Sequence, residues 1–199
     1  MKKQIIALFI MTFMAAGLAA ETGYKGINWG SSEFIIESKE GEETNPLSKA
    51  QPGYITKVYE KQLLGEKTNL FYILQKDYGL ICIYYSTPKG NTRKLKSNLK
   101  NKNLVGTIKY PSIDVSTLKE KIKQQVPDDA DRLVEWLAGF TLMHFPLGLE
   151  TEYRYKWPNL EGDGLISIYD YNDDTRIYIF ENIILEKTVV VYFPHEEDY

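Results

Sequence analysis

The sequence predicts an α+β protein, in which antiparallel β-meander sheets carry helices packed on one face. The first observation is a series of short segments rich in tyrosine and β-branched residues, separated by turn residues, which is typical of a meander. The second is an apolar stripe with helical spacing in the middle of the chain. The third is that both halves place helices before strands, which is consistent with a tandem duplication. Four of the predicted strands follow one another near the end of the chain: Thr151–Trp157, Gly164–Tyr171, Thr175–Glu181 and Lys187–Phe193.

The first twenty residues have the three-part layout of a secretory signal peptide. Lys2 and Lys3 precede an apolar run from Ile5 to Met14, and small residues follow it. The apolar run is shorter than the roughly 20 residues that a membrane-spanning helix needs. We therefore expect cleavage near Ala19 or Ala20 and a periplasmic or secreted bacterial protein, with no transmembrane segment in the mature chain.

The remaining chain is divided by composition into two halves and a basic linker. Residues 21–88 contain a short helix that Ser31 or Ser32 can cap, followed by three strands, and residues 104–199 contain two helices followed by four strands. Residues 89–103 join the halves. The linker's cations also form a candidate anion-binding patch, which consists of Lys89, Arg93, Lys94, Lys96, Lys100 and Lys102.

The start of the predicted mature chain resembles that of certain uncharacterised exported bacterial proteins, including spirochaete proteins. The similarity is carried by Gly26-Ile27-Asn28-Trp29-Gly30-Ser31-Ser32 and by the hairpin segments Leu70–Leu74 and Gly79–Tyr85. The order of helices and strands is also similar to the tandem layout of the β-lactamase-inhibitor-like fold. Neither resemblance supplies catalytic residues.

Two helices are predicted between the linker and the last strands. Apolar residues recur at helical spacing from Val115 to Val126, and Pro127 ends that helix. The second begins near Asp128, carries one broad apolar stripe that includes His144, and stops at Pro146. We expect this second helix to be buried on the sheet.

Tyrosine is over-represented, with fifteen residues, and most of them lie in predicted strands. In this part of the chain, Ile166 and Ile168 point to the side opposite Leu165, Tyr169 and Tyr171, so the sheet is expected to have an aliphatic face under the helices and an open face lined with tyrosine. Tyrosine is favoured at recognition surfaces, although it also has a high strand propensity. The candidate binding residues are Tyr153, Tyr155, Trp157, Tyr169, Tyr171 and Tyr178.

The sequence contains no recognisable constellation of catalytic or metal-binding residues. Cys82 is the only cysteine, and the two histidines lie in an apolar helix and in the tail. The run Asp170-x-Asn172-x-Asp174 imitates the start of a calcium-binding EF-hand loop, but Thr175 stands where that loop requires glycine. We predict no catalytic residues, no metal site and no cofactor, and we interpret Cys82 as a buried apolar side chain.

The leading hypothesis is a non-catalytic envelope protein that binds a protein or an envelope component through the tyrosine-rich sheet face. The alternative is a small periplasmic hydrolase whose acid–base pair, or His144, is assembled only in three dimensions. The net charge of −3, which becomes more negative without Lys2 and Lys3, argues against a nucleic-acid partner.

Overall fold

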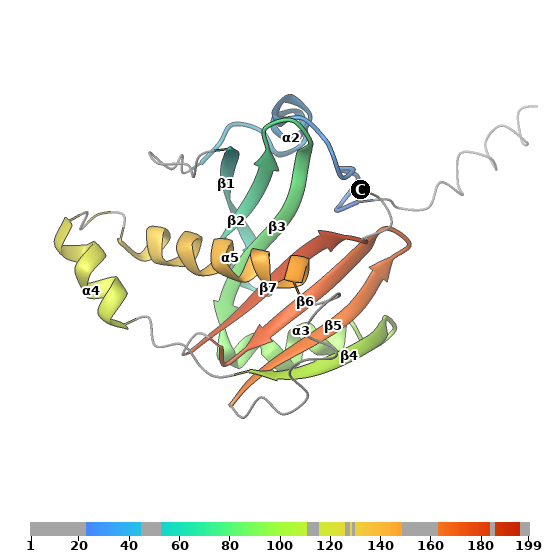
Figure 1. Cartoon of the computed structure of the whole chain (residues 1–199), viewed down its shortest axis with the longest axis vertical. Helices are drawn as coiled ribbons and strands as arrows, with labels where there is room; N and C mark the ends of the chain where they lie inside the picture. The colour runs from blue at the N-terminus through green and yellow to red at the C-terminus, as the bar shows by residue number, and fades with distance from the viewer. Residues whose placement is uncertain are drawn as a thin grey trace, which may run out of the picture.

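The centre of the fold is one continuous antiparallel sheet of seven strands in the order β1-β2-β3-β7-β6-β5-β4 (Figure 1). The structure is a computed structural model that describes residues 23–44, 53–110, 116–125, 128, 130–148, 163–183 and 186–195, without the side chains of Leu118 and of residues 143–148. The strands are β1 (Tyr54–Leu63), β2 (Glu66–Gln75), β3 (Gly79–Pro88), β4 (Asn103–Tyr110), β5 (Gly164–Asn172), β6 (Thr175–Glu181) and β7 (Lys187–Pro194).

Two meanders make up this sheet, and they meet where β3 pairs with β7. Strands β1, β2 and β3 follow one another along the chain, as do β4, β5, β6 and β7. At the junction, Tyr85 pairs with Val190 and Thr87 with Thr188. The last strand of the chain therefore lies at the centre of the sheet, and the outer edges belong to β1 and β4.

Positive backbone angles close the first hairpin. Leu64 and Gly65, between β1 and β2, have φ angles of 56° and 93°. Two consecutive positive φ angles match the strong twist of a two-residue hairpin turn.

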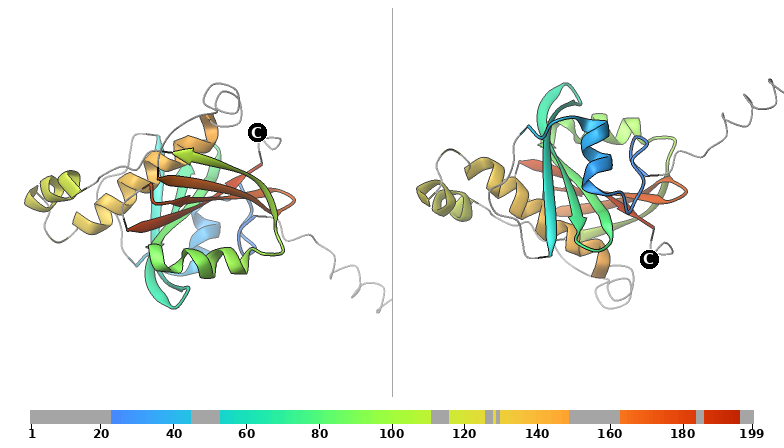
Figure 2. Two further views of the ribbon diagram at one scale, coloured as in Figure 1. Left: turned by 90° about the horizontal axis from the view of Figure 1, so that it is seen from below. Right: turned by 90° about the horizontal axis from the view of Figure 1, so that it is seen from above.

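Helices cover both faces of the sheet (Figure 2). The long helix α5 (Ala130–Gly148) lies across one face, which we call the α5 face, and α4 (Ser116–Gln125) packs against it at the side of the sheet. The short helices α2 (Glu33–Glu40) and α3 (Thr92–Asn98) lie on the opposite face, the α2/α3 face. Because strand side chains alternate between faces, each strand contributes to two hydrophobic cores.

The core under α5 is anchored by Trp136. Its indole Nε1 donates to Thr56 Oγ1 at 3.2 Å, and its carbonyl oxygen accepts from the Tyr84 hydroxyl at 3.0 Å. The Tyr84 ring in turn stacks on Phe71, with 4.7 Å between ring centroids. Ile166 and Ile168 lie in this core, as the alternation of β5 predicts.

The core on the α2/α3 face is rich in tyrosine. Tyr24 and Tyr192 meet edge to face at 4.7 Å between centroids, and Tyr59 and Tyr72 do so at 5.6 Å. Ile36 from α2 and Leu95 from α3 pack against them. Burial raises the pKa of Tyr59 and of Tyr85 to about 12 in each case.

The predicted α+β class and the antiparallel meander are confirmed. The placement of the helices differs from the prediction of one covered face, because α2 and α3 bury Ile36, Leu95 and Leu99 against the second face. The predicted strand Thr151–Trp157 lies outside the described residues. The edge of β5 where that strand was expected is occupied by β4, which pairs Lys109 with Leu165.

The basic segment predicted as a linker is instead a 3₁₀ turn, η1 (Lys89–Asn91), followed by α3. Leu95 and Leu99 lie four residues apart and are 4% and 5% exposed, so one face of this segment is apolar enough to pack on the sheet. The Thr92 hydroxyl donates to Lys89 O at 2.8 Å and lies 2.6 Å from Thr188 Oγ1. These contacts tie the start of α3 to β7.

In the part of the chain that the structure describes, no helix has both the length and the hydropathy needed to cross a bilayer.

Candidate functional site

The predicted tyrosine surface is only partly assembled, and it is covered. Tyr169 and Tyr171 face the α2/α3 side, whereas Tyr178 lies in the core under α5, so the three do not share a face. Tyr169 and Tyr178 are 9% and 3% exposed, and Tyr171 is partly exposed. A tyrosine-rich face does exist, but helices and the segment around Tyr24 fill it as core. The other candidates, Tyr153, Tyr155 and Trp157, lie outside the described residues.

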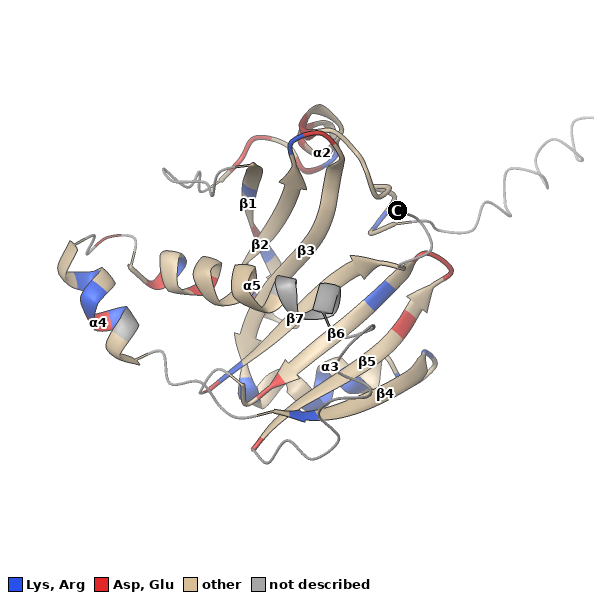
Figure 3. Ribbon diagram, viewed as in Figure 1, with Lys and Arg blue, Asp and Glu red and all other residues tan. Residues whose placement is uncertain are grey.

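The predicted anion patch lies on and around α3, where Figure 3 shows lysine and arginine in blue. Several of its cations contact groups of the protein itself. Lys89 Nζ donates to Asn182 Oδ1 at 3.0 Å, Lys94 Nζ donates to Leu64 O at 2.8 Å, and Lys96 forms an ion pair with Glu181. Lys102 donates to Tyr171 O and lies over the Tyr171 ring. Arg93 and Lys100 are exposed at the surface.

The residues that imitate a calcium loop take part in turn and strand contacts. Asp170 accepts from Arg176 Nε at 3.2 Å and from Asn103 Nδ2 at 3.0 Å. Asp174 accepts from the backbone nitrogen of Gly23. Among the described residues, no group of three or more histidine, cysteine or acidic side chains is arranged to hold a metal ion.

Cys82 is completely buried in the core under α5, and burial raises the pKa of its thiol well above the usual value. The interpretation of Cys82 as a buried apolar residue is confirmed. His195 lies at the end of β7, with Nε2 3.7 Å from Asp170 Oδ1. His144 lies within α5, and its side chain is outside the described residues.

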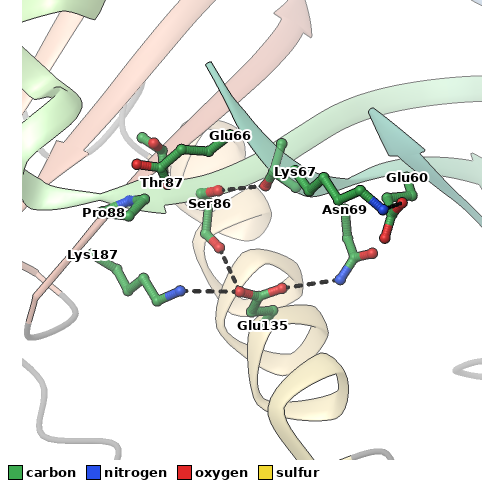
Figure 4. A pocket seen from close by; sticks show the side chains of 10 residues that line it. Glu60, Glu66, Lys67, Asn69, Ser86, Thr87, Pro88, Glu135 and Lys187 are labelled. Carbon is green, nitrogen blue, oxygen red and sulfur yellow. Dashed lines mark hydrogen bonds and ion pairs between the residues drawn. The ribbon is translucent and has the colours of Figure 1, made fainter. Parts of the chain in front are cut away.

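The described part of the molecule has a small polar pocket where the first half of α5 crosses the sheet (Figure 4). Its volume is about 190 Å³. Strands β1, β2, β3 and β7 and helix α5 supply the lining residues, which are Glu60, Glu66, Lys67, Thr68, Asn69, Ser86, Thr87, Pro88, Glu135 and Lys187. We call it the Glu135 pocket.

Glu135 is held by donors from three different strands. Ser86 Oγ on β3 donates to Glu135 Oε1 at 2.9 Å, and Lys187 Nζ on β7 donates to the same oxygen at 3.2 Å. Asn69 Nδ2 on β2 donates to Oε2 at 3.3 Å. Figure 4 shows these side chains converging on the carboxylate. The carboxylate is therefore fixed in position by the sheet on which α5 packs.

Further contacts organise the rest of the pocket. Thr68 Oγ1 donates to Ser86 O at 2.7 Å, which fixes the backbone beside the carboxylate. At the rim, Lys67 pairs with Glu60 at 2.8 Å, while Glu66 is exposed. No histidine and no aromatic residue of the described chain lines this pocket.

A second, wider depression near α2 is lined by acids that share one lysine. The ammonium of Lys57 pairs with Glu33, with Glu37 at 2.9 Å and with Glu43 at 3.6 Å. Burial alone would lower the pKa of Lys57, but the hydrogen bonds that its ammonium donates to Glu33 and Glu37 outweigh the burial and raise the pKa. The acids there are already occupied by a cation of the protein, so we regard the Glu135 pocket as the better candidate site.

Sequence reasoning did not select Glu135. The sequence does contain an indication of this site, because Glu135 is an acid flanked by Val134 and Trp136 on a helix that is predicted to be buried. A half-buried acid requires hydrogen-bond or ion-pair partners. The partners Asn69, Ser86 and Lys187 lie on three separate strands, and the β2–β3 and β3–β7 pairings together bring them close to one another.

No protein-family model matches this chain, and comparisons with curated proteins and with solved structures also found no match.

Proposed function

We propose that this chain is an exported, non-catalytic binding protein that recognises a basic group of a protein or envelope component through the Glu135 pocket. The observation that carries the proposal is the fixed Glu135 carboxylate at the pocket, on which the described residues leave one acceptor position unused. This replaces the tyrosine-rich face as the expected recognition surface, because that face is filled by the molecule's own helices.

The remaining acceptor position follows from the geometry of the carboxylate. An ionised carboxylate has about four lone-pair positions on its two oxygens. Ser86 and Lys187 use two positions on Oε1, and Asn69 uses one on Oε2. The second position on Oε2 suits an N–H donor of a ligand, and because the carboxylate is already oriented, little conformational entropy is lost when that donor binds.

Size and lining restrict the ligand further. A volume of about 190 Å³ is below the roughly 300–1,000 Å³ of sites for drug-sized molecules, so the pocket fits the end of a side chain. Three acids and two lysines line it, which leaves a small negative excess. The absence of aromatic lining among the described residues argues against a stacked ring. An ammonium or guanidinium group of a partner protein meets these conditions.

The test is an NMR titration of the ¹⁵N-labelled protein with methylguanidinium and with n-butylammonium. We expect concentration-dependent shifts at Asn69, Ser86 and Glu135, loss of these shifts in Glu135→Gln, and retention in the control Glu120→Gln on α4. Equal shifts with uncharged n-butanol, or no shifts with either cation, would contradict the proposal.

One contact favours the alternative function, a small hydrolase. The hydrogen bond from Ser86 Oγ to Glu135 Oε1 at 2.9 Å has the length expected between a nucleophile and its base. Covalent labelling of Ser86 by a fluorophosphonate probe, abolished in Glu135→Gln, would support the hydrolase. We expect no labelling, because Ser86 is 8% exposed and Lys187 competes for the oxygen that would have to accept the proton.

A further inference from the structure

The large apolar side chains that are exposed in the described part of the chain gather mainly at one end of the molecule. Phe34, Ile35 and Tyr78 are 74%, 40% and 63% exposed, and Leu104, on the edge strand β4, is the further example among the described residues. Phe34 and Ile35 lie on α2, and Tyr78 lies in the turn between β2 and β3. Figure 1 shows α2 and this turn together at the upper end of the sheet. We call the surface formed by Phe34, Ile35 and Tyr78 the α2 tip.

Backbone contacts hold the two parts of the α2 tip together. Gly30 N donates to Leu80 O at 2.9 Å, and Leu80 N donates to Ser31 O at 2.9 Å, just before α2 begins. A Cβ atom placed on Gly79 would lie 2.1 Å from Gly30 O, so only glycine allows the two backbones to approach this closely. The start of α2 and the end of the hairpin therefore form one unit that presents its side chains in a fixed arrangement.

The packing of α2 keeps Phe34 directed toward solvent. Ile36 is completely buried in the core on the α2/α3 face. Residues two positions apart lie on opposite sides of a helix, so Phe34 cannot turn inward while Ile36 stays in the core. Single exposed apolar side chains are normal, but a group of them marks an interaction site.

The area of the α2 tip restricts what binds there. The exposed parts of its two aromatic rings and one isoleucine amount to roughly 300 Å². A stable interface between two proteins needs about 800 Å² on each partner. The patch is therefore too small to hold a second copy of the chain, but it fits one or two apolar side chains of a partner segment.

An excess of negative charge borders the α2 tip. Glu33, Glu37 and Glu43 share the single ammonium of Lys57. The Lys57 side chain is 14% exposed, whereas those of Glu33 and Glu37 are 40% and 45% exposed, so carboxylates rather than the ammonium face the solvent beside Phe34. The other exposed charges of α2 and of the turns beside it balance one another, and they are Lys39, Glu42, Lys76 and Asp77.

We propose that the α2 tip docks a basic, apolar segment of a partner protein. Apolar side chains of that segment pack on Phe34 and Tyr78, and its lysine or arginine side chains pair with Glu33 and Glu37 or lie over the exposed rings. The same negative charge disfavours an anionic lipid surface. The surface shares no residue with the Glu135 pocket and does not depend on it.

The test is an NMR titration of the ¹⁵N-labelled protein with the synthetic peptide KLLKLLK, which is both basic and apolar. We expect shifts of the backbone amides of Phe34, Ile35 and Tyr78. The double variant Phe34→Ser with Tyr78→Ser should bind the peptide more weakly by about tenfold or more, because aromatic anchors carry much of the binding energy at such interfaces. Leu104→Ser is the matched control and should leave binding unchanged. All of these side chains are exposed, so the variants keep the fold, which their melting temperatures verify.

Two further peptides separate the contributions of charge and of apolar surface. ELLELLE keeps the leucines and reverses the charge, whereas KSSKSSK keeps the charge without the leucines. We expect neither peptide to shift the amides of the α2 tip. Equal binding of either peptide, or unchanged binding of KLLKLLK by the double variant, would overturn the proposal.

Glu135→Gln distinguishes the α2 tip from the Glu135 pocket, and it should leave the binding of KLLKLLK unchanged. Loss of binding in this variant, with shifts confined to Asn69 and Ser86, would overturn the α2 tip and support the proposed function. Binding to phosphatidylcholine vesicles that the double variant loses would assign the tip to a lipid surface and would also overturn the proposal.

Discussion

Gly139 of α5 lies directly against the ring of Tyr84 on β3. A Cβ atom placed on Gly139 would be 1.9 Å from Tyr84 Cε2, much closer than any real contact. The ring cannot withdraw, because it stacks on Phe71 and its hydroxyl bonds to Trp136 O. The missing side chain is what allows α5 to approach the sheet closely enough for Glu135 to reach its donors.

The first prediction is that Gly139→Ala destabilises the protein, although alanine is the better helix former. Overpacking of a core costs about 1–3 kcal/mol, which exceeds the 0.5–1 kcal/mol that replacing a helical glycine contributes. Urea unfolding followed by circular dichroism measures the difference. Gly90→Ala is the control, because a Cβ there meets nothing within 4 Å. Unchanged stability of Gly139→Ala would mean that α5 does not pack at this distance.

The second prediction concerns α3, which the sequence alone suggested was a solvated linker. Leu95→Ala should lower the free energy of unfolding by about 2–4 kcal/mol, because the side chain is 4% exposed within a packed core. Arg93→Ala, on the exposed side of the same helix, should change it by less than about 0.5 kcal/mol. Chemical denaturation of the two variants compares them directly, and equal small effects would restore the linker interpretation.

The third prediction is a loss of stability at alkaline pH. Burial raises the pKa of Tyr59 and Tyr85 to about 12, and it also raises the pKa of Tyr84 and Tyr192. Because these groups release their protons more easily in the unfolded chain, their contribution is complete below pH 10 and is lost as the pH rises from 10 toward 12.

Urea unfolding at pH 8, 9.5, 10.5 and 11.5 measures this decline, and absorbance at 295 nm reports tyrosine ionisation. Tyr85→Phe should make the decline less steep, whereas Tyr78→Phe should leave it unchanged, because Tyr78 is 63% exposed. A free energy of unfolding that stays constant from pH 8 to 11.5 would contradict the buried tyrosine core.

The fourth prediction tests the anion patch. We expect weak retention on heparin that a triple Lys94, Lys96 and Lys100 to Glu variant hardly changes, because Lys96 is neutralised by Glu181 and Lys94 is bonded to Leu64 O. Elution at several salt concentrations provides the measurement. Salt-sensitive retention that disappears in the triple variant would instead support anion binding.

Local patterns predicted most of the strands, because side-chain alternation is a property of each segment. Thr175–Glu181 was predicted with the bounds that β6 has, and β5 and β7 begin at the predicted residues. The pattern missed β4, where the pairing shifts register between Leu104 and Gly106 and interrupts the alternation. It also missed α3, where six cations between Lys89 and Lys102 hid the apolar pair Leu95 and Leu99.

The candidate site could not be predicted in the same way. Glu135 is separated from Ser86 and Asn69 by 49 and 66 positions, and each residue alone has an ordinary local context. Their meeting depends on strand order and on the docking of α5, which no short stretch of sequence encodes. The predicted tyrosine surface was only partly assembled, because Tyr178 lies in the core under α5 while Tyr169 and Tyr171 lie on the α2/α3 face, and α2 and α3 cover that face.

The position of β7 has a consequence for how the chain is made. Translation delivers this strand after the other six described strands, yet it is the strand that joins β1–β3 to β4–β6. Until Lys187–Pro194 has left the ribosome, β3 pairs only with β2. The continuous sheet that separates the two hydrophobic cores cannot form before then. A chain with this strand order cannot complete its sheet until the segment Lys187–Pro194 is available to pair with both β3 and β6.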